Sequence, residues 1–175
     1  YPQLIGDHQI DNVSTAIAAV LRLNELGYNI PKKIINSAII KTKWPGRLEK
    51  GKLKNINIYL DGAHNIDGAT QLLKFFKNKK IRVWMILGML NNKDVFNFIK
   101  KLKPILNGII AIKIPNEKNS YSTTQISKVC QTLKINCISK SSVIQANEFL
   151  IKKVKPRTIL VTGSLYLVGK IRENY

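Results

Sequence analysis

Polar and charged side chains gather in the turns that follow three of the predicted strands. Asp61 and His64 follow the first strand, Lys93 follows the second, and Ser164 follows the last. A carboxylate accepts hydrogen bonds, an imidazole can bind or move a proton, and an ammonium group or a hydroxyl can bind an anion. Because ligands of open parallel α/β sheets bind beyond the carboxyl ends of the strands, these side chains predict a ligand site at that edge.

Each of these residues also has a purely structural explanation. Asp61 and Asp94 could cap the turns or helices that they precede, and His64 could be a turn residue at the surface. Lys93 could be one more solvated lysine. The joint appearance of aspartate, histidine, lysine and serine at one edge favours a functional site over four separate structural explanations.

Alternating helices and strands are expected to position these turns. Two helices, at residues 8–26 and 32–41, form an N-terminal segment that ends near Trp44. A hairpin follows, with strands at residues 48–50 and 53–60 around Gly51. The remaining helices are expected at residues 69–76, 94–103, 122–133 and 141–154, and the remaining strands at residues 82–87, 109–114, 135–138 and 158–162.

This order predicts an α/β fold with a Rossmann-like open sheet. The sheet would contain five mostly parallel strands, and the hairpin strand near Arg47 would be an antiparallel edge strand. Helices would cover both faces, and the N-terminal helical segment would precede this domain.

Several common sites are absent from the sequence. There is no GxxxxGK[ST] phosphate-binding loop, no GxGxxG turn after a strand and no GxSxG nucleophile turn. The two histidines and two cysteines are too few for a zinc site, so no metal site is expected. Cys130 and Cys137 are expected to be buried thiols in a reducing cytoplasm.

The chain is strongly basic, with 29 basic and 10 acidic residues and a formal charge of +19. Lysine clusters end three predicted helices, where they face the negative end of the helix dipole. Arginine, the usual reader of base edges, occurs only 5 times. We therefore expect a solvated basic surface that can steer an anionic substrate, and no nucleic-acid partner.

The longest apolar run, residues 83–90, is too short to cross a bilayer, and no signal peptide is apparent. We expect a cytoplasmic protein without a membrane partner. The chain does not begin with Met, so we expect a trimmed chain or a part of a longer one.

Five motifs resemble those of the folylpolyglutamate synthase / dihydrofolate synthase family, which belongs with the Mur ligases. The family's GxHQxxN, WPGRLE, DGAHN, LGMLxDKD and GSLYLVG are similar to residues 6–12, 44–49, 61–65, 87–94 and 163–169. Order and spacing agree over essentially the whole chain. In two departures, Ile66 replaces the usual proline and Asn92 replaces the usual aspartate; these affect fine specificity rather than membership.

The resemblance implies an ATP-dependent amide ligase. ATP phosphorylates the carboxylate of dihydropteroate or the γ-carboxylate of a folate, and the amine of L-glutamate attacks the acyl phosphate. Residues 1–43 resemble the tail of a central ATPase domain with the hinge, and residues 44–175 resemble the C-terminal domain. The family's phosphate-binding loop and Mg²⁺ ligands lie in the ATPase domain, so this chain alone is expected to hold neither ATP nor Mg²⁺. We expect the enzyme to be a monomer.

The resemblance also implies roles for individual residues. Four match nucleotide contacts of the family: Asn12 at adenine, Asp61 at the ribose, and Arg47 and His64 at the phosphates, where both would be catalytic. Three match, by analogy with the glutamate-adding Mur ligase, residues that bind the substrate glutamate: Asn65, Lys93 and Ser164.

Three alternatives stay open. The chain could be a domain of a Mur-type peptidoglycan ligase, a basic nucleic-acid-binding module, or a free-standing regulatory or structural remnant of a ligase. WPGRLE and GSLYLVG favour the folate branch. Salt-dependent binding to non-specific DNA would identify the nucleic-acid module.

Overall fold

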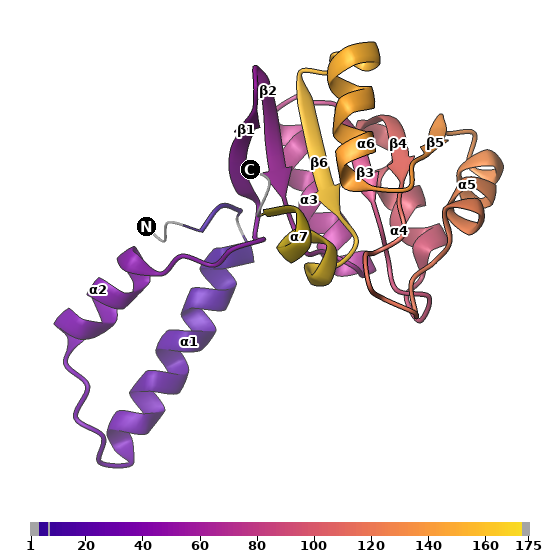
Figure 1. The fold of residues 1–175 in the computed structure, drawn as a ribbon. Coiled ribbons are helices and arrows are strands. Elements are labelled where there is room, and N and C mark those ends of the chain that lie inside the picture. Colours follow the sequence, from indigo (N-terminus) through magenta and orange to yellow (C-terminus); the bar gives the residue numbers. More distant parts are fainter. Residues whose placement is uncertain (1–3, 7, 173–175) are drawn as a thin grey trace.

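The computed structural model describes residues 4–6 and 8–172 (Figure 1). The helices are α1 (His8–Glu25), α2 (Lys32–Lys41), α3 (Ile66–Asn78), α4 (Val95–Leu102), α5 (Thr123–Thr132), α6 (Val143–Phe149) and α7 (Leu165–Arg172). The strands are β1 (Glu49–Leu53), β2 (Ile56–Leu60), β3 (Val83–Leu87), β4 (Leu106–Ala111), β5 (Cys137–Ser139) and β6 (Thr158–Thr162). A 3₁₀ turn, η1 (Lys103–Ile105), follows α4, and a π-helical turn, η2 (Leu150–Val154), continues α6.

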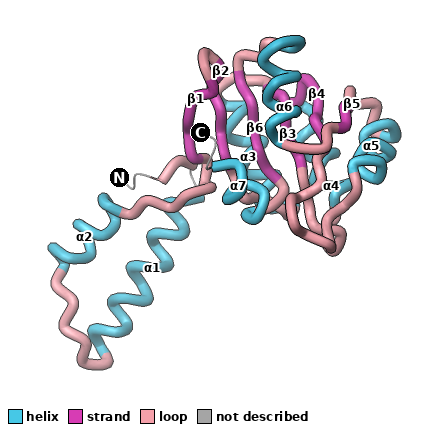
Figure 2. The backbone as a smooth tube through the Cα atoms, viewed as in Figure 1, coloured by secondary structure: helices cyan, strands magenta, loops and turns pink. Residues whose placement is uncertain are grey.

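The strands form one six-stranded sheet in the order β1-β2-β6-β3-β4-β5 (Figure 2). Only β1 runs antiparallel to its neighbour, β2, and the other pairs are parallel. The predicted open sheet with an antiparallel edge strand is therefore confirmed. The last strand, β6, lies between β2 and β3, so the turns after these three strands meet at one edge of the sheet.

Both faces of the sheet are buried. In β3, Met85 and Leu87 pack in a cluster with α3, α4 and α5, whereas Trp84 and Ile86 pack in a second cluster with α6 and α7. Burial of both faces explains why the central strands are continuous apolar runs rather than alternating ones. Each fully buried aliphatic or aromatic side chain contributes about 1.5–3 kcal/mol to stability.

Local signals define the helix ends. The side chains of Asp94, Ser122 and Ser142 each accept a hydrogen bond from a backbone N–H in the first turn of the next helix. The pKa of Asp94 is lowered because its carboxylate accepts from the N–H and the side-chain amide of Asn97. Asp94 therefore has the capping role that its position before the helix predicts. Lysines occupy the last turns of α3, α4 and η2, as their helix-end role predicts.

The structure corrects four details of the sequence prediction. Gly51 lies inside β1, and the hairpin turns at Lys54, whose φ of +53° is left-handed. Strand β4 starts and ends earlier than residues 109–114, although Ile112 and Ile114 are still buried. The helix expected over residues 141–154 ends as the π-helical turn η2. Helix α7 was not predicted at all.

Helices α1 and α2 extend away from the sheet (Figure 1). None of the residues of α2 is buried, and Ile10, Leu21 and Ile34 are large exposed apolar side chains. A groove of about 470 Å³ lies between the two helices and reaches Trp44; its lining is mostly aliphatic. Within the described residues, no helix is both long and apolar enough to span a membrane.

The two cysteines differ in accessibility, because Cys130 is buried whereas Cys137 is only half-buried. The pKa of Cys137 is lowered to about 7, mainly by hydrogen bonding with Cys130 and in smaller part by Ser127, whose Oγ lies 3.6 Å from Cys137 Sγ. The same contact and burial raise the pKa of Cys130. Because the thiolate is the nucleophile, Cys137 is the more reactive thiol.

We therefore expect iodoacetamide at pH 8 to alkylate Cys137 before Cys130. The alkylation rate of Cys137 should rise with a midpoint near pH 7, and Ser127→Ala should move this midpoint upward. Peptide mass spectrometry over a pH series measures both. Equal rates at the two cysteines, or a midpoint near the ordinary value of about 8.5 for a free thiol, would contradict this assignment.

Candidate functional site

Backbone hydrogen bonds hold together the turns after β2, β6 and β3. The carbonyl of Ala63 accepts from Gly163 N (2.9 Å) and from the Thr162 hydroxyl (3.1 Å), and Gly88 N donates to Thr162 O (3.4 Å). Gly163 has a φ of +106°, and a Cβ atom there would lie 2.5 Å from the carbonyl oxygen of Gly88. Only glycine fits this close approach, so Gly163 is needed for the turns to meet.

A polar cavity of about 380 Å³ opens beside these turns. Five of the seven predicted site residues line it: Asn12, Arg47, Asp61, His64 and Asn65. Asn12 comes from α1, so the N-terminal segment forms one wall and the edge of the sheet forms the other. Lys93 and Ser164 do not line this cavity.

Asp61 connects two of the loops around the cavity. Its side chain is only 6% exposed, and its two carboxylate oxygens accept from Leu48 N and from Ala63 N, each at 2.8 Å. Leu48 directly follows Arg47, so Asp61 fixes the backbone that carries this arginine. An ionised carboxylate only accepts hydrogen bonds, so Asp61 presents an acceptor at the wall of the cavity.

The hydrogen bond of His64 determines which of its ring nitrogens can act. Nδ1 lies 2.9 Å from the carbonyl oxygen of Gly62. A carbonyl can only accept, so Nδ1 must carry the proton. In the neutral ring Nε2 is therefore the acceptor, and the half-buried imidazole lines the cavity.

Asn12 and Asn65 are exposed side chains with local partners. Asn12 donates through Nδ2 to Gln9 Oε1 at 3.0 Å, one turn earlier on α1. Asn65 is the N-cap of α3, and its Oδ1 accepts from Gly68 N at 2.9 Å. The Nδ2 group of Asn65 stays available as a donor, because the cap uses only its oxygen.

Lys93 lies in the turn after β3, which a second loop supports. The Tyr121 hydroxyl donates to Lys93 O (3.0 Å), Tyr121 N donates to Met89 O (2.9 Å), and Asn91 N donates to Asn119 O (2.8 Å). Lys93 itself is half-buried.

Ser164 is 3% exposed and directly precedes α7. Its Oγ accepts from Tyr166 N at 3.1 Å, so the hydroxyl is a helix N-cap. The hydroxyl hydrogen can still donate, but its burial limits access for a ligand. Lys93 and Ser164 follow the adjacent strands β3 and β6, at the same edge of the sheet but outside the cavity.

Sequence reasoning missed three polar residues that line the cavity: Gln9, Asp67 and Gln71. Asp67 and Gln71 are four positions apart on α3, so they lie on the same helix face. That spacing was visible in the sequence, but only the structure shows that this face borders the cavity. Within residues 4–6 and 8–172, no group of three or more His, Cys, Asp or Glu side chains could hold a metal ion.

Fold and site together define an open α/β domain with a polar cleft at the carboxyl edge of its sheet. The family model described as the C-terminal domain of dihydrofolate synthetase matches residues 46–174. The chain therefore belongs to this dihydrofolate synthetase family.

Similar proteins agree with this membership. The chain is 32% identical to the dihydrofolate synthase/folylpolyglutamate synthase of Bacillus subtilis, over 97% of the chain and 40% of that protein. It is 28% identical to the UDP-N-acetylmuramoyl-L-alanyl-D-glutamate–L-lysine ligase of Streptococcus thermophilus, over 96% of the chain and 34% of that protein. The solved Escherichia coli FolC in complex with DHPP and ADP matches with a TM-score of 0.79 and 26% identity, over 99% of the chain and 40% of that structure. The chain thus spans well under half the length of these proteins.

Proposed function

We propose that the chain is the C-terminal part of an ATP-dependent ligase that adds L-glutamate to dihydropteroate or to the γ-carboxylate of a folate. One observation carries the proposal: a single cavity collects Asn12, Arg47, Asp61 and His64, the residues that resemble the family's nucleotide contacts. The family match and the Escherichia coli relative solved with ADP support it.

The residues of the cavity suit a nucleotide in three ways. Asn12 offers amide groups on α1 for a base, and Asp61 offers a carboxylate, which can accept a hydrogen bond from a ribose hydroxyl. Arg47 has a permanently charged guanidinium with five donors, which matches phosphate oxygens. Arg47 would stabilise the charge that shifts during phosphoryl transfer from ATP.

His64 is proposed to accept a proton from the amine of glutamate. The amine of glutamate attacks the acyl phosphate only as the free base, so a proton must leave the ammonium group. Because Nδ1 donates to Gly62, the free Nε2 of His64 can accept that proton.

We assign glutamate binding to Asn65, Lys93 and Ser164. Their support is their position: Lys93 and Ser164 follow adjacent strands, and Asn65 ends the turn whose Ala63 carbonyl is bonded to Gly163. An ammonium group, an amide and a hydroxyl are suitable partners for carboxylates.

The N-terminal segment, residues 1–43, would be the tail of an ATPase domain with the hinge, and residues 44–175 would be the closing domain. The aliphatic groove between α1 and α2 supports this division, because large exposed apolar patches mark interaction surfaces. We place the Mg²⁺ site in the ATPase domain, as the family resemblance implies. We call this chain together with that domain the complete ligase, and expect it to be a monomer.

The proposal is tested by ADP release from the complete ligase with a panel of substrates. L-Glutamate with dihydropteroate, or with a reduced folate, should support ADP release and give a product with one more glutamyl residue. The likeness to the Streptococcus thermophilus ligase makes UDP-N-acetylmuramoyl peptide with L-lysine the necessary comparison. Activity only with the muramoyl peptide would contradict the folate assignment and favour a Mur-type ligase.

The chain of 175 residues alone should not turn over ATP. It contains no phosphate-binding loop, and the described residues offer no metal cluster, so it cannot hold a triphosphate in line for transfer. A coupled ADP assay with glutamate and dihydropteroate checks this expectation, and the complete ligase is the positive control. Sustained glutamate-dependent ADP release by the isolated chain would contradict the proposal that ATP and Mg²⁺ binding require the ATPase domain.

A further inference from the structure

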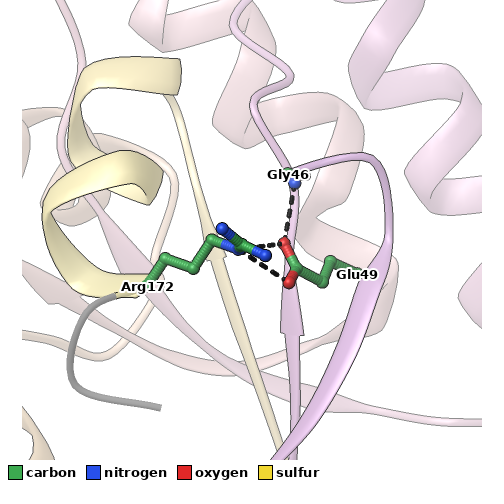
Figure 3. A network of polar contacts seen from close by, with 3 residues as sticks. All are labelled: Gly46, Glu49 and Arg172. Atoms are coloured by element: carbon green, nitrogen blue, oxygen red, sulfur yellow. Dashed lines mark hydrogen bonds and ion pairs between the residues drawn. The ribbon is translucent and has the colours of Figure 1, made fainter. Parts of the chain in front are cut away.

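We propose that the ion pair between Glu49 and Arg172 positions Arg47, so that Arg172 on the last helix is a positioning residue for the ligase reaction. This inference rests on the proposed function, because it concerns the arginine assigned to the phosphates. Figure 3 shows the contacts that carry it, with Glu49 between Gly46 and Arg172.

Glu49 joins two distant parts of the chain. Its Oε2 accepts from Gly46 N at 2.9 Å. Arg172 Nε donates to Oε1 at 2.9 Å and to Oε2 at 3.2 Å. Arg172 lies 123 positions after Glu49, at the end of α7. The pair therefore ties the loop at residues 44–49 to the C-terminal helix.

The backbone on both sides of Arg47 is fixed by further contacts. Gly46 O accepts from Gly62 N at 2.8 Å, and Leu48 N donates to the Asp61 carboxylate at 2.8 Å. Gly46 and Leu48 both have positive φ values, +72° and +47°, so this loop has an unusual conformation that its surroundings must stabilise. Within the described part of the chain, by contrast, the Arg47 side chain has no hydrogen bond or ion pair, so it can reach into the cavity.

Helix α7 also supports the loop by packing. A Cβ atom on Gly46 would lie 3.0 Å from Val168 Cγ1, and one on Gly62 would lie 2.2 Å from Leu165 Cδ2. The loop and the turn after β2 therefore rest directly on α7. Arg172, on the same helix, adds the polar contact that sets where the loop ends and β1 begins.

The exposure of the pair limits its contribution. The Glu49 side chain is 29% exposed and that of Arg172 is 52% exposed, so the pair is partly screened by solvent. Exposed pairs change an equilibrium by up to about fivefold. A small displacement of a catalytic group can cost more than this in rate, because transfer requires good alignment.

Amide exchange in the chain itself tests whether the Glu49–Arg172 pair holds the loop at residues 44–49, without any assay of activity. Arg172→Gln should increase the exchange rates of the Gly46 and Leu48 amides by about fivefold, as measured by NMR. Arg22→Gln removes a matched exposed pair, Arg22 with Glu25 on α1, and should leave both amides unchanged. Unchanged exchange rates in Arg172→Gln would show that the Glu49–Arg172 pair does not hold this loop.

Kinetics of the complete ligase test the link to Arg47. Arg172→Gln and Glu49→Gln should each lower kcat by about 5- to 30-fold with the KM for ATP within twofold, and Arg172→Lys should recover part of the loss. The double variant should be no slower than the slower single variant, because both act through one contact. Arg22→Gln and the melting temperature serve as controls.

Two outcomes distinguish a failure of the positioning role from a failure of the Arg47 assignment. If exchange rises in Arg172→Gln but kcat is unchanged while Arg47→Ala is slow, the positioning role is wrong and the function of Arg47 stands. If Arg47→Ala is as active as the wild type, the assignment of Arg47 fails first, and the positioning role fails with it.

Discussion

Arg47→Ala in the complete ligase is expected to lower kcat by about two to three decades, which corresponds to about 2.7–4 kcal/mol of lost transition-state stabilisation. The reason is that the guanidinium acts on charge that moves during transfer, more than on ground-state ATP. The KM for ATP should change by less than about threefold, since a group that acts only in the transition state lowers kcat and kcat/KM together. Steady-state kinetics with varied ATP measures both constants.

A matched control is Arg157→Ala. Arg157 is an exposed arginine just before β6, at the opposite edge of the sheet from the cavity. It should leave both constants unchanged. If Arg47→Ala kept the wild-type kcat and raised only the KM for ATP, Arg47 would be a plain binding group.

Lys93→Ala is expected to raise the KM for glutamate by about one to two decades, because a charge-assisted hydrogen bond contributes about 1.5–3 kcal/mol. The KM for ATP should stay within about twofold, since Lys93 does not line the cavity that contains Arg47. Arg47→Ala, by contrast, should lower kcat and leave the KM for glutamate unchanged. Kinetics with varied glutamate at saturating ATP measures the effect.

Lys101→Ala is the control for Lys93→Ala, because Lys101 is also half-buried but belongs to the last turn of α4. It should change neither KM value. An unchanged glutamate KM in Lys93→Ala would show that Lys93 is one of the many solvated lysines. The role that Lys93 was given by analogy with the glutamate-adding Mur ligase would then be wrong.

Much of the fold could be predicted because its core strands are distinctive in the sequence. The residues of β3 and β6 are all buried, and both strands appear as short apolar runs between polar turns. Helix α7 was missed because its residues, Leu165–Arg172, include Gly169 and carry a mixed apolar pattern that does not define one face. Its one clear signal is Ser164, a serine directly before the apolar residues, which is typical of an N-cap.

The candidate site could be predicted as a set of turns but not as a set of contacts. The DGAHN and WPGRLE motifs identify Asp61 and Arg47, yet nothing in the sequence shows that Asp61 bonds the backbone of Leu48. The pairing of Glu49 with Arg172 spans most of the chain, and it depends on where α7 ends. Such contacts depend on tertiary packing, which neither periodicity nor motif spacing determines.

The most direct test of the central claim compares two ligands of the complete ligase. ADP alone represents the ground state, and ADP with aluminium fluoride imitates the phosphoryl group in transfer, for which transition-state analogues gain at least about 100-fold in affinity. Isothermal titration calorimetry should show that Arg47→Ala binds ADP as the wild type does but loses about 100-fold in affinity for ADP with aluminium fluoride. Equal losses for both ligands, or no loss for either, would contradict the claim that this domain brings Arg47 to the transferring phosphate.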